Sequence, residues 1–446
     1  MERSSKIQLS DHFDYKRLLS FTLAPICTMI FTSLYSIVDG FFVSNYVGNT
    51  AFASLNLTMP YIMIIAAVGF MFGSGGSALV SMYFGLGEKQ KAKESFSLIV
   101  YVLIAIGTGL ALLSEWLAPE ISRILGASES MMPYCVLYIR ITMFGMVFFM
   151  LQNLFQSFLI TAERPKMGFI ITLIAGCSNM ILDWLLVGVF NLGIAGAAWA
   201  TVISQVLGGG IPFLFFLCPN SSMLKLTSTR LDFAVIAKTC GNGISEFLSN
   251  ISASIVGFLY NLQLLHYAGE NGVSAYGVIM YVSFVFVAIY IGYSMGVAPI
   301  IGFNYGANNK KELQNVFKES VVILGITNVI MTIGSQILTE PLVKLFVGYD
   351  RKLYDLTVTG MRIYCVAFLV MGLNIFASAL FTALNNGTVS AILSISRTLI
   401  LQIIMIYLLP TVFGVNGLWL VVIAVEGISV IISTFFVLRN RRKYGY

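Results

Sequence analysis

The chain has 446 residues, of which 58% are hydrophobic and only 10% are charged, and its formal net charge is +6. This composition excludes a water-soluble globular protein and predicts a polytopic membrane protein. The basic excess does not indicate nucleic-acid binding, because lysine and arginine also set the orientation of membrane helices. Six scattered cysteines without a CxxC pair and two histidines predict neither a disulfide framework nor a metal or haem centre.

Twelve apolar runs reach the length of a membrane-spanning helix, which is about 20 residues. The polar segment before the first run has mixed charge, so no cleavable signal is expected. We therefore expect an all-α membrane protein with twelve transmembrane helices. They cover residues 18–43, 55–80, 95–115, 133–158, 167–189, 193–217, 239–266, 273–301, 316–338, 356–382, 388–410 and 416–438.

The basic residues are distributed unevenly between the two sides of the predicted membrane. Twenty of the 26 lysines and arginines fall in the two termini and in every second loop, and six fall in or near the opposite loops. Because cytoplasmic loops carry the excess of lysine and arginine, both termini are predicted to be cytoplasmic.

The first span contains a proline and an acid. Pro25 predicts a bend or hinge in this helix. Asp39 lies about 22 residues beyond Arg17, roughly 33 Å of helix, which places it in the outer half of the membrane. A solvated helix end next to Gly40 is the alternative for Asp39. Tyr35, one turn earlier, is typical of a packing aromatic.

Polar residues continue in the fourth span. Asn153 and Gln156 form a polar stripe that either lines a cavity or bonds to backbone groups. Tyr138 in the same span is typical of a packing or membrane-belt aromatic.

The fifth and sixth spans are joined by a short turn and place an acid inside hydrocarbon. An ionisable group there is costly and usually faces a cavity or an ion pathway. Asn179 precedes Asp183 by one turn, so both project from one face. At roughly 1.5 Å per residue, Thr201 on the returning helix lies at a similar depth. The three groups predict a small cation or proton site, although Asn179 and Thr201 also suit ordinary contacts between helices.

The two halves of the chain repeat one another at an offset of 221 to 222 residues. Gly75 falls on Gly296, and Gly85 falls on Gly306. So many matches at one offset indicate duplication, and an even number of spans per half predicts two six-helix bundles related by pseudo-two-fold symmetry along the membrane normal. The predicted division is an N-lobe over 1–217, a cytoplasmic linker over 218–238 and a C-lobe over 239–446. Other matched positions are Tyr46 with Tyr267, Gly48 with Gly269, Gly193 with Gly414, and Gln205 with Glu426.

The charges of the two halves do not repeat. Asp39 aligns with Tyr260 and Asp183 with Ile404, so the acids are concentrated in the N-lobe. Two further acids belong to the C-lobe. Glu246, which aligns with Pro25, and Glu426 near mid-membrane are candidates for lining a cavity there.

These features resemble the MATE (multidrug and toxic compound extrusion) family over essentially the whole chain. The resemblance rests on the duplicated twelve-span pattern, on Val38-Asp39-Gly40 and on the run from Asn179 to Thr201. It is nearest to the DinF/MepA-like bacterial branch. The resemblance implies a coupling site of Asp39, Asn179, Asp183 and Thr201, supported by Tyr35 and Tyr138, in which Na⁺ can take the place of a proton.

The resemblance also implies a function. We expect a multidrug efflux antiporter in the bacterial cytoplasmic membrane, driven by H⁺ or Na⁺, that exports amphipathic, often cationic compounds by alternating access. The expected partners are small-molecule substrates and the lipid bilayer. No cofactor, catalytic residue, nucleic acid or obligate protein partner is expected. The alternatives are a lipid-linked precursor flippase and a metabolite or organic-acid exporter, which needs basic cavity groups; Arg397 is the one candidate.

Overall fold

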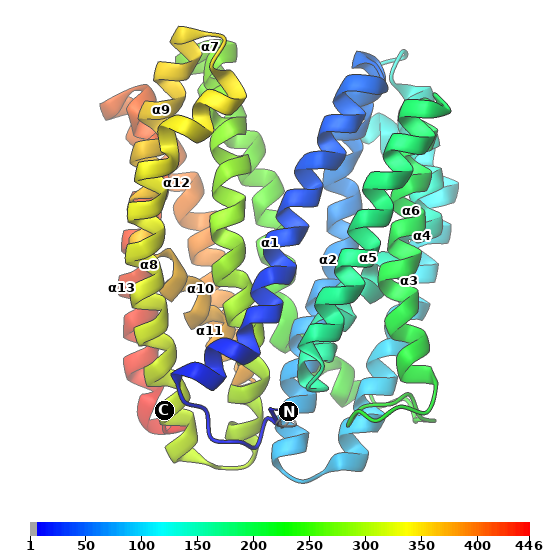
Figure 1. Cartoon of the computed structure of the whole chain (residues 1–446), viewed down its shortest axis with the longest axis vertical. Helices are drawn as coiled ribbons and strands as arrows, with labels where there is room; N and C mark the ends of the chain where they lie inside the picture. Colours follow the sequence, from blue (N-terminus) through cyan, green and yellow to red (C-terminus); the bar gives the residue numbers. More distant parts are fainter. Residues whose placement is uncertain (1–6) are drawn as a thin grey trace, which may run out of the picture.

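The computed structural model describes residues 7–446, except for the side chains of residues 36, 39–41, 43–45 and 49. Throughout this part of the chain the regular structure is helical (Figure 1). The α-helices are α1 (Tyr15–Tyr46), α2 (Asn49–Gly85), α3 (Lys89–Ile124), α4 (Met132–Thr161), α5 (Pro165–Leu182), α6 (Gly193–Leu217), α7 (Phe233–Gly306), α8 (Lys310–Val347), α9 (Arg351–Cys365), α10 (Phe368–Ala383), α11 (Gly387–Ile395), α12 (Leu401–Phe413) and α13 (Val415–Tyr444). Two π-helices, η1 (Asp183–Val189) and η2 (Ser396–Ile400), follow α5 and α11.

The twelve predicted crossings are confirmed. Among the described residues, ten helices are long and apolar enough to cross a membrane, and α9 with α10 forms a further crossing bent by 52°. α7 crosses twice, because it reverses at Gly269, where φ is 63° and ψ is −157°. Only a residue without a Cβ adopts this backbone readily.

The bend between α9 and α10 differs from the single tenth span expected over 356–382. Its cause is a tightened backbone turn. The amides of Val366 and Ala367 bond to the carbonyls of Ile363 and Tyr364, three residues back, and no longer to those four residues back.

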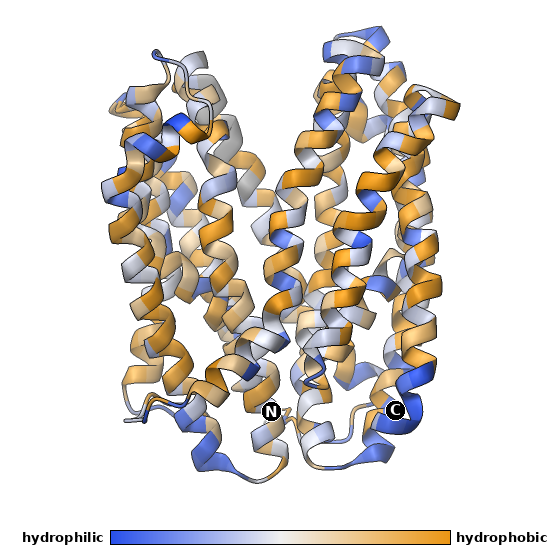
Figure 2. Cartoon of the chain, turned by 180° about the vertical axis from the view of Figure 1, so that it is seen from behind, coloured by the Kyte–Doolittle hydropathy of each residue, from blue (hydrophilic) through white to orange (hydrophobic). Residues whose placement is uncertain are grey.

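The helices form two bundles with separate hydrophobic cores, which confirms the two-lobe architecture. Helices α2 to α6 surround one core and α7 to α13 the other; they lie on the right and left of Figure 1. The exact lobe boundaries at 217 and 239 stay a prediction. Hydrophobic residues dominate the middle of the helices, and hydrophilic residues gather toward the two ends of the molecule (Figure 2). We call the end that carries both chain termini the terminal end, and the opposite one the far end.

α1 connects the two lobes. Its first turns pack in the C-lobe core through Leu18 and Phe21, which are almost fully buried. It then crosses to the N-lobe and packs against α5. The ribbons of the two bundles lie close together at the terminal end and diverge toward the far end (Figure 1).

Glycines bring the lobes into backbone contact toward the terminal end. A Cβ at Gly75 of α2 would overlap the Thr239 carbonyl of α7, and one at Gly243 would overlap the Met71 carbonyl. Gly85 and Gly306 form a second such contact, since a Cβ on either would overlap a backbone carbonyl of the other helix. We call these contacts between α2 and α7 the glycine seam.

The seam follows the internal repeat. Gly75 and Gly296 are equivalent positions, and Gly296 packs against Thr22 of α1 just as Gly75 packs against α7. One turn away, a Cβ at Gly292 would lie 2.5 Å from the Cα of Ile26 and 2.8 Å from the carbonyl oxygen of Pro25. The repeated glycines therefore serve the contact between the lobes, and the predicted hinge Pro25 lies in that contact.

The segment before α1 is anchored at the terminal end, although its sequence suggests only a polar tail. The amide of Leu9 donates to Glu163 Oε1 of the N-lobe (2.7 Å). The amide of Phe13 donates to Glu312 Oε1 of the C-lobe (2.8 Å), and His12 Nδ1 lies 2.7 Å from Glu312 Oε2. Leu9 and Phe13 are fully buried, which fixes the segment against α8.

This anchor predicts a pH dependence. The hydrogen bond to Glu312 and the charge of that carboxylate raise the pKa of His12 above its ordinary value of 6.5. Because the pKa is raised in the folded state, the His12–Glu312 attraction is fully present below pH 6.5 and is lost as the pH rises through the raised value. In a His266→Gln background, an NMR titration of His12 should give a pKa above 6.5 that returns toward 6.5 in Glu312→Gln. A pKa near 6.5 in both proteins would exclude the contact.

Candidate functional site

The buried acid of the N-lobe begins a π-helix. Asp183 is fully buried and its backbone amide still bonds to the carbonyl of Asn179, so the two side chains lie one turn apart as predicted. From Asp183 onward the helix widens, and the amide of Phe190 bonds to Leu185, five residues back. Such π-segments are rare and occur frequently at functional sites. The sequence gives no signal for it, because no proline or paired glycine marks the widening.

The face of α5 that carries Asn179 and Asp183 is turned toward α1. Gly176 lies on the same face, one turn before Asn179, and a Cβ there would lie 3.1 Å from Tyr35 Cδ1 of α1. The structure therefore brings Tyr35 to this face. Asn179 is only 3% exposed. The side chain of Asp39 lies outside the described residues, so its place in the site stays a prediction.

Thr201 and Tyr138 belong to the same lobe. Thr201 is half-buried on α6, where its hydroxyl donates to the Ala197 carbonyl (3.0 Å). Tyr138 of α4 is buried in the N-lobe core. Asp183 begins η1 and Thr201 lies on α6, which packs against it; their shared depth and a common ligand remain predictions.

The two residues of the polar stripe on α4, Asn153 and Gln156, lie in different environments. Asn153 is buried, and its Nδ2 has no hydrogen-bond partner among the described residues. Gln156 instead lines a narrow crevice together with Pro25 of α1 and Met295 of α7. The crevice therefore joins the predicted hinge, a predicted cavity residue and the C-lobe.

The C-lobe acids have different environments. Glu426 is almost fully buried; Arg397 Nε donates to its Oε1 (2.8 Å) and Asn374 Nδ2 donates to its Oε2 (2.7 Å). Glu246 is half-buried on α7, within electrostatic reach of Arg397. Sequence reasoning considered Arg397 only as a basic cavity group and missed its pairing with Glu426.

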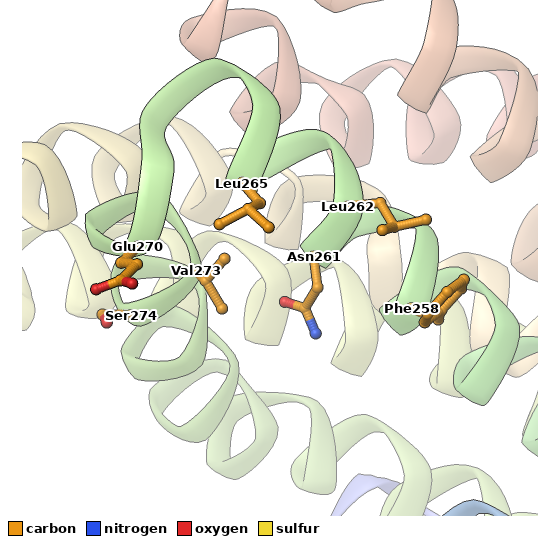
Figure 3. Close-up of a pocket in the computed structure, with 7 residues that line it drawn as sticks. All are labelled: Phe258, Asn261, Leu262, Leu265, Glu270, Val273 and Ser274. Atoms are coloured by element: carbon orange, nitrogen blue, oxygen red, sulfur yellow. The ribbon is translucent and has the colours of Figure 1, made fainter. Parts of the chain in front are cut away.

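A separate groove of about 380 Å³ lies beside the Gly269 turn of α7. Figure 3 shows Asn261 and Leu265 on one arm of the helix, facing Val273 on the other, with Glu270 at the edge. No predicted site residue lines this groove, so we do not assign it to the site.

Asn179 and Asp183 give one face of the N-lobe site an amide and a carboxylate, which suits a proton or a small cation. Within residues 7–446 as described, no three His, Cys, Asp or Glu side chains gather to hold a metal ion. The Na⁺ site at Asp39, Asn179, Asp183 and Thr201 includes an undescribed side chain and stays a prediction.

Comparison with known proteins identifies the family. A family model described as MatE matches residues 25–185 and 247–408, and the two matches begin 222 residues apart, as the repeat predicts. The multidrug export protein MepA of Staphylococcus aureus (strain MRSA252) is 24% identical over 413 residues, covering 92% of this chain and 90% of MepA. Two solved structures superpose with a TM-score of 0.91 at 20% identity: the outward-facing conformation of a multidrug resistance MATE family transporter, covering 98% of both chains, and MATE in complex with MaL6, covering 97%. The chain belongs to the MATE family of multi-pass membrane transporters and is not an enzyme.

Proposed function

We propose that the protein is an efflux antiporter that exchanges H⁺ or Na⁺ for amphipathic, often cationic compounds. The observation that carries this proposal is Asp183, a carboxylate fully buried at membrane depth at the start of a π-helix. A carboxylate there attracts a cation strongly, because little water screens it. The curated relative is itself described as a multidrug export protein.

Exchange follows from competition at this carboxylate. Cationic cargo and the coupling ion are both attracted by the negative charge of Asp183 and Asp39 and compete for it. Binding of the ion therefore releases the cargo. Pro25 provides the conformational response: it lies in the contact between α1 and Gly292 of the C-lobe. A bend of α1 at Pro25 therefore changes the N-lobe site and the contact between the lobes together, which is what alternating access requires.

We place the protein in the cytoplasmic membrane with both termini inside. This orientation rests on the excess of lysine and arginine in the termini and alternate loops. Under it, the glycine seam closes the cytoplasmic side, and the described conformation is the one that faces outward.

The direct test is ethidium efflux from proteoliposomes under a pH gradient or a Na⁺ gradient imposed separately. We expect efflux under one gradient and none under the other, and this identifies the coupling ion. Liposomes without protein are the control. Absence of ethidium movement under both gradients would reject the proposal.

Neither alternative function gains support from the site. An organic-acid exporter needs an unmatched basic group at membrane depth, but Arg397 is paired with Glu426. A flippase for lipid-linked pyrophosphates needs several such groups, whereas the deep N-lobe charge is acidic.

A further inference from the structure

The C-lobe contains a buried charge network that the proposed N-lobe mechanism does not use. It consists of Arg397 on η2, Glu426 on α13 and Asn374 on α10. Asn374 Nδ2 donates to Oε2 and to the main-chain carbonyl of Glu426 (2.7 and 3.0 Å). Arg397 donates through Nε to Glu426 Oε1 (2.8 Å). Glu426 is thus fixed from one side by a neutral amide and from the other by a cation.

The internal repeat shows that the fold does not require these charges. At the offset of 221, Glu426 corresponds to Gln205, Asn374 to Asn153 and Arg397 to Gly176. The N-lobe therefore builds the same position from two neutral amides and a glycine. Since a buried ion pair is weak evidence for stability, retention of the charges in one lobe favours a functional role.

Glu246 lies beside the contact between the lobes. It follows Thr239 and Gly243 at helical spacing, so the three residues share one face of α7. Thr239 and Gly243 are the residues that meet Gly75 and Met71 of α2. Glu246 therefore belongs to the side of the C-lobe that faces the N-lobe, directly beyond the glycine seam, where cargo held between the lobes would contact it.

Arg397 bonds to Glu426 and lies within electrostatic reach of Glu246, because η2 packs against α7. Ser245 and Ser390 lie at one level, because both contact Thr382 (3.5 and 2.8 Å). Arg397 is seven residues, or about 10 Å of helix, beyond Ser390, so a long side chain is needed to span the offset to Glu246. The guanidinium has five N–H donors, of which Nε accounts for the described bond to Glu426. Its side chain is 20% exposed, against 3% for Glu426, and no residue of η2 is fully buried.

We propose that Arg397 is a movable internal cation. Arg397 pairs with Glu426 while cationic cargo occupies Glu246. Protonation of Glu426 transfers Arg397 to Glu246, and the arrival of Arg397 there expels the cargo. This rests on the proposed export of cations. The described structure, with Arg397 on Glu426, is the state before protonation of Glu426, in which cargo on Glu246 has not yet been displaced.

The charges balance in this exchange. The incoming proton binds the Glu426 carboxylate and neutralises it, so the N–H donors of Arg397 leave Glu426 and bind the Glu246 carboxylate. The cargo cation then departs, and one positive charge has entered for each that leaves. Arg397 from η2 and Asn374 from α10 bond to Glu426, and Tyr290 from α7 and Tyr364 from α9 lie within its electrostatic reach. Among the described residues, the charged group within reach of Glu246 is Arg397.

Second-site suppression tests the proposal. We would measure the Kd of ethidium at pH 8 by fluorescence with the full-length protein in nanodiscs. Glu426→Gln imitates the protonated acid and should weaken binding about tenfold, because Arg397 then neutralises Glu246. Adding Arg397→Gln should restore the wild-type Kd or improve on it. Glu246→Gln should weaken binding whether or not Arg397 is present.

Two results would overturn the proposal: an unchanged Kd in Glu426→Gln, or a double variant that binds more weakly than the single one, as a structural role requires. The matched control is the exposed ion pair of Glu340 and Arg362, whose double glutamine variant should keep the wild-type Kd. A wild-type protein that neither binds nor exports ethidium would instead contradict the proposed function itself.

Discussion

Asp183→Asn and Asp39→Asn should each reduce ion-driven ethidium efflux to the level of liposomes without protein. Asparagine has nearly the same shape as aspartate, but it neither carries a charge nor takes up a proton at neutral pH, so the competition between ion and cargo disappears. Folding should be retained, since asparagine preserves the size and shape of the buried side chain and keeps a polar group for its surroundings. We therefore expect the unfolding temperature of Asp183→Asn to stay close to that of the wild type.

The matched control for these variants is Asp355→Asn at an exposed position of α9, where the carboxylate is 61% exposed beside Arg351. It should leave efflux unchanged, because a solvated ion pair contributes little. Efflux that persists in both N-lobe variants would move ion coupling to the C-lobe acids. Loss of efflux together with a lowered unfolding temperature would assign Asp183 a structural role.

The architecture could be predicted from the sequence because hydrocarbon allows few solutions. Backbone groups in lipid must form their hydrogen bonds within the helix, so each sufficiently long apolar run indicates one membrane-spanning helix. The repeat then gave two lobes, and its glycines marked equivalent places. What the repeat could not show is the partner of each glycine: that Gly75 meets Thr239, and Gly243 meets Met71, depends on how the lobes pack.

The site was only partly predictable for the same reason. The spacing of Asn179 and Asp183 is local and survives in the structure. The π-helix at Asp183 and the bend at Val366 are changes of backbone register that hydrophobicity does not encode. The pairing of Arg397 with Glu426 joins residues 29 positions apart on different helices. The repeat aligns Gln205 with Glu426 and so indicates a polar position in both lobes. It does not indicate that Arg397 pairs with Glu426, because Arg397 has no charged counterpart in the N-lobe.

Gly243→Ala should shift the conformational equilibrium away from the described state. A Cβ at this position would overlap the Met71 carbonyl, which is backbone of the opposite lobe, so the seam must separate. Overpacking of this kind costs about 1–3 kcal/mol, which is roughly a 5- to 150-fold change in an equilibrium. The variant should therefore populate conformations open at the terminal end and export ethidium more slowly.

Cys240, which is half-buried on α7 between Thr239 and Gly243, reports this opening. In a protein that lacks the other five cysteines, a membrane-impermeant maleimide supplied at the terminal end should label Cys240 faster in Gly243→Ala than in the parent. Gly257→Ala, on the same helix, is the matched control, because a Cβ there would meet no atom within 4 Å. Equal labelling rates in all three proteins would show that the glycine seam does not hold the lobes together. Since Gly75, Gly85 and Gly306 make equivalent contacts, the same substitution at each should give the same direction of change. A graded response across the four positions would identify the contact that opens first.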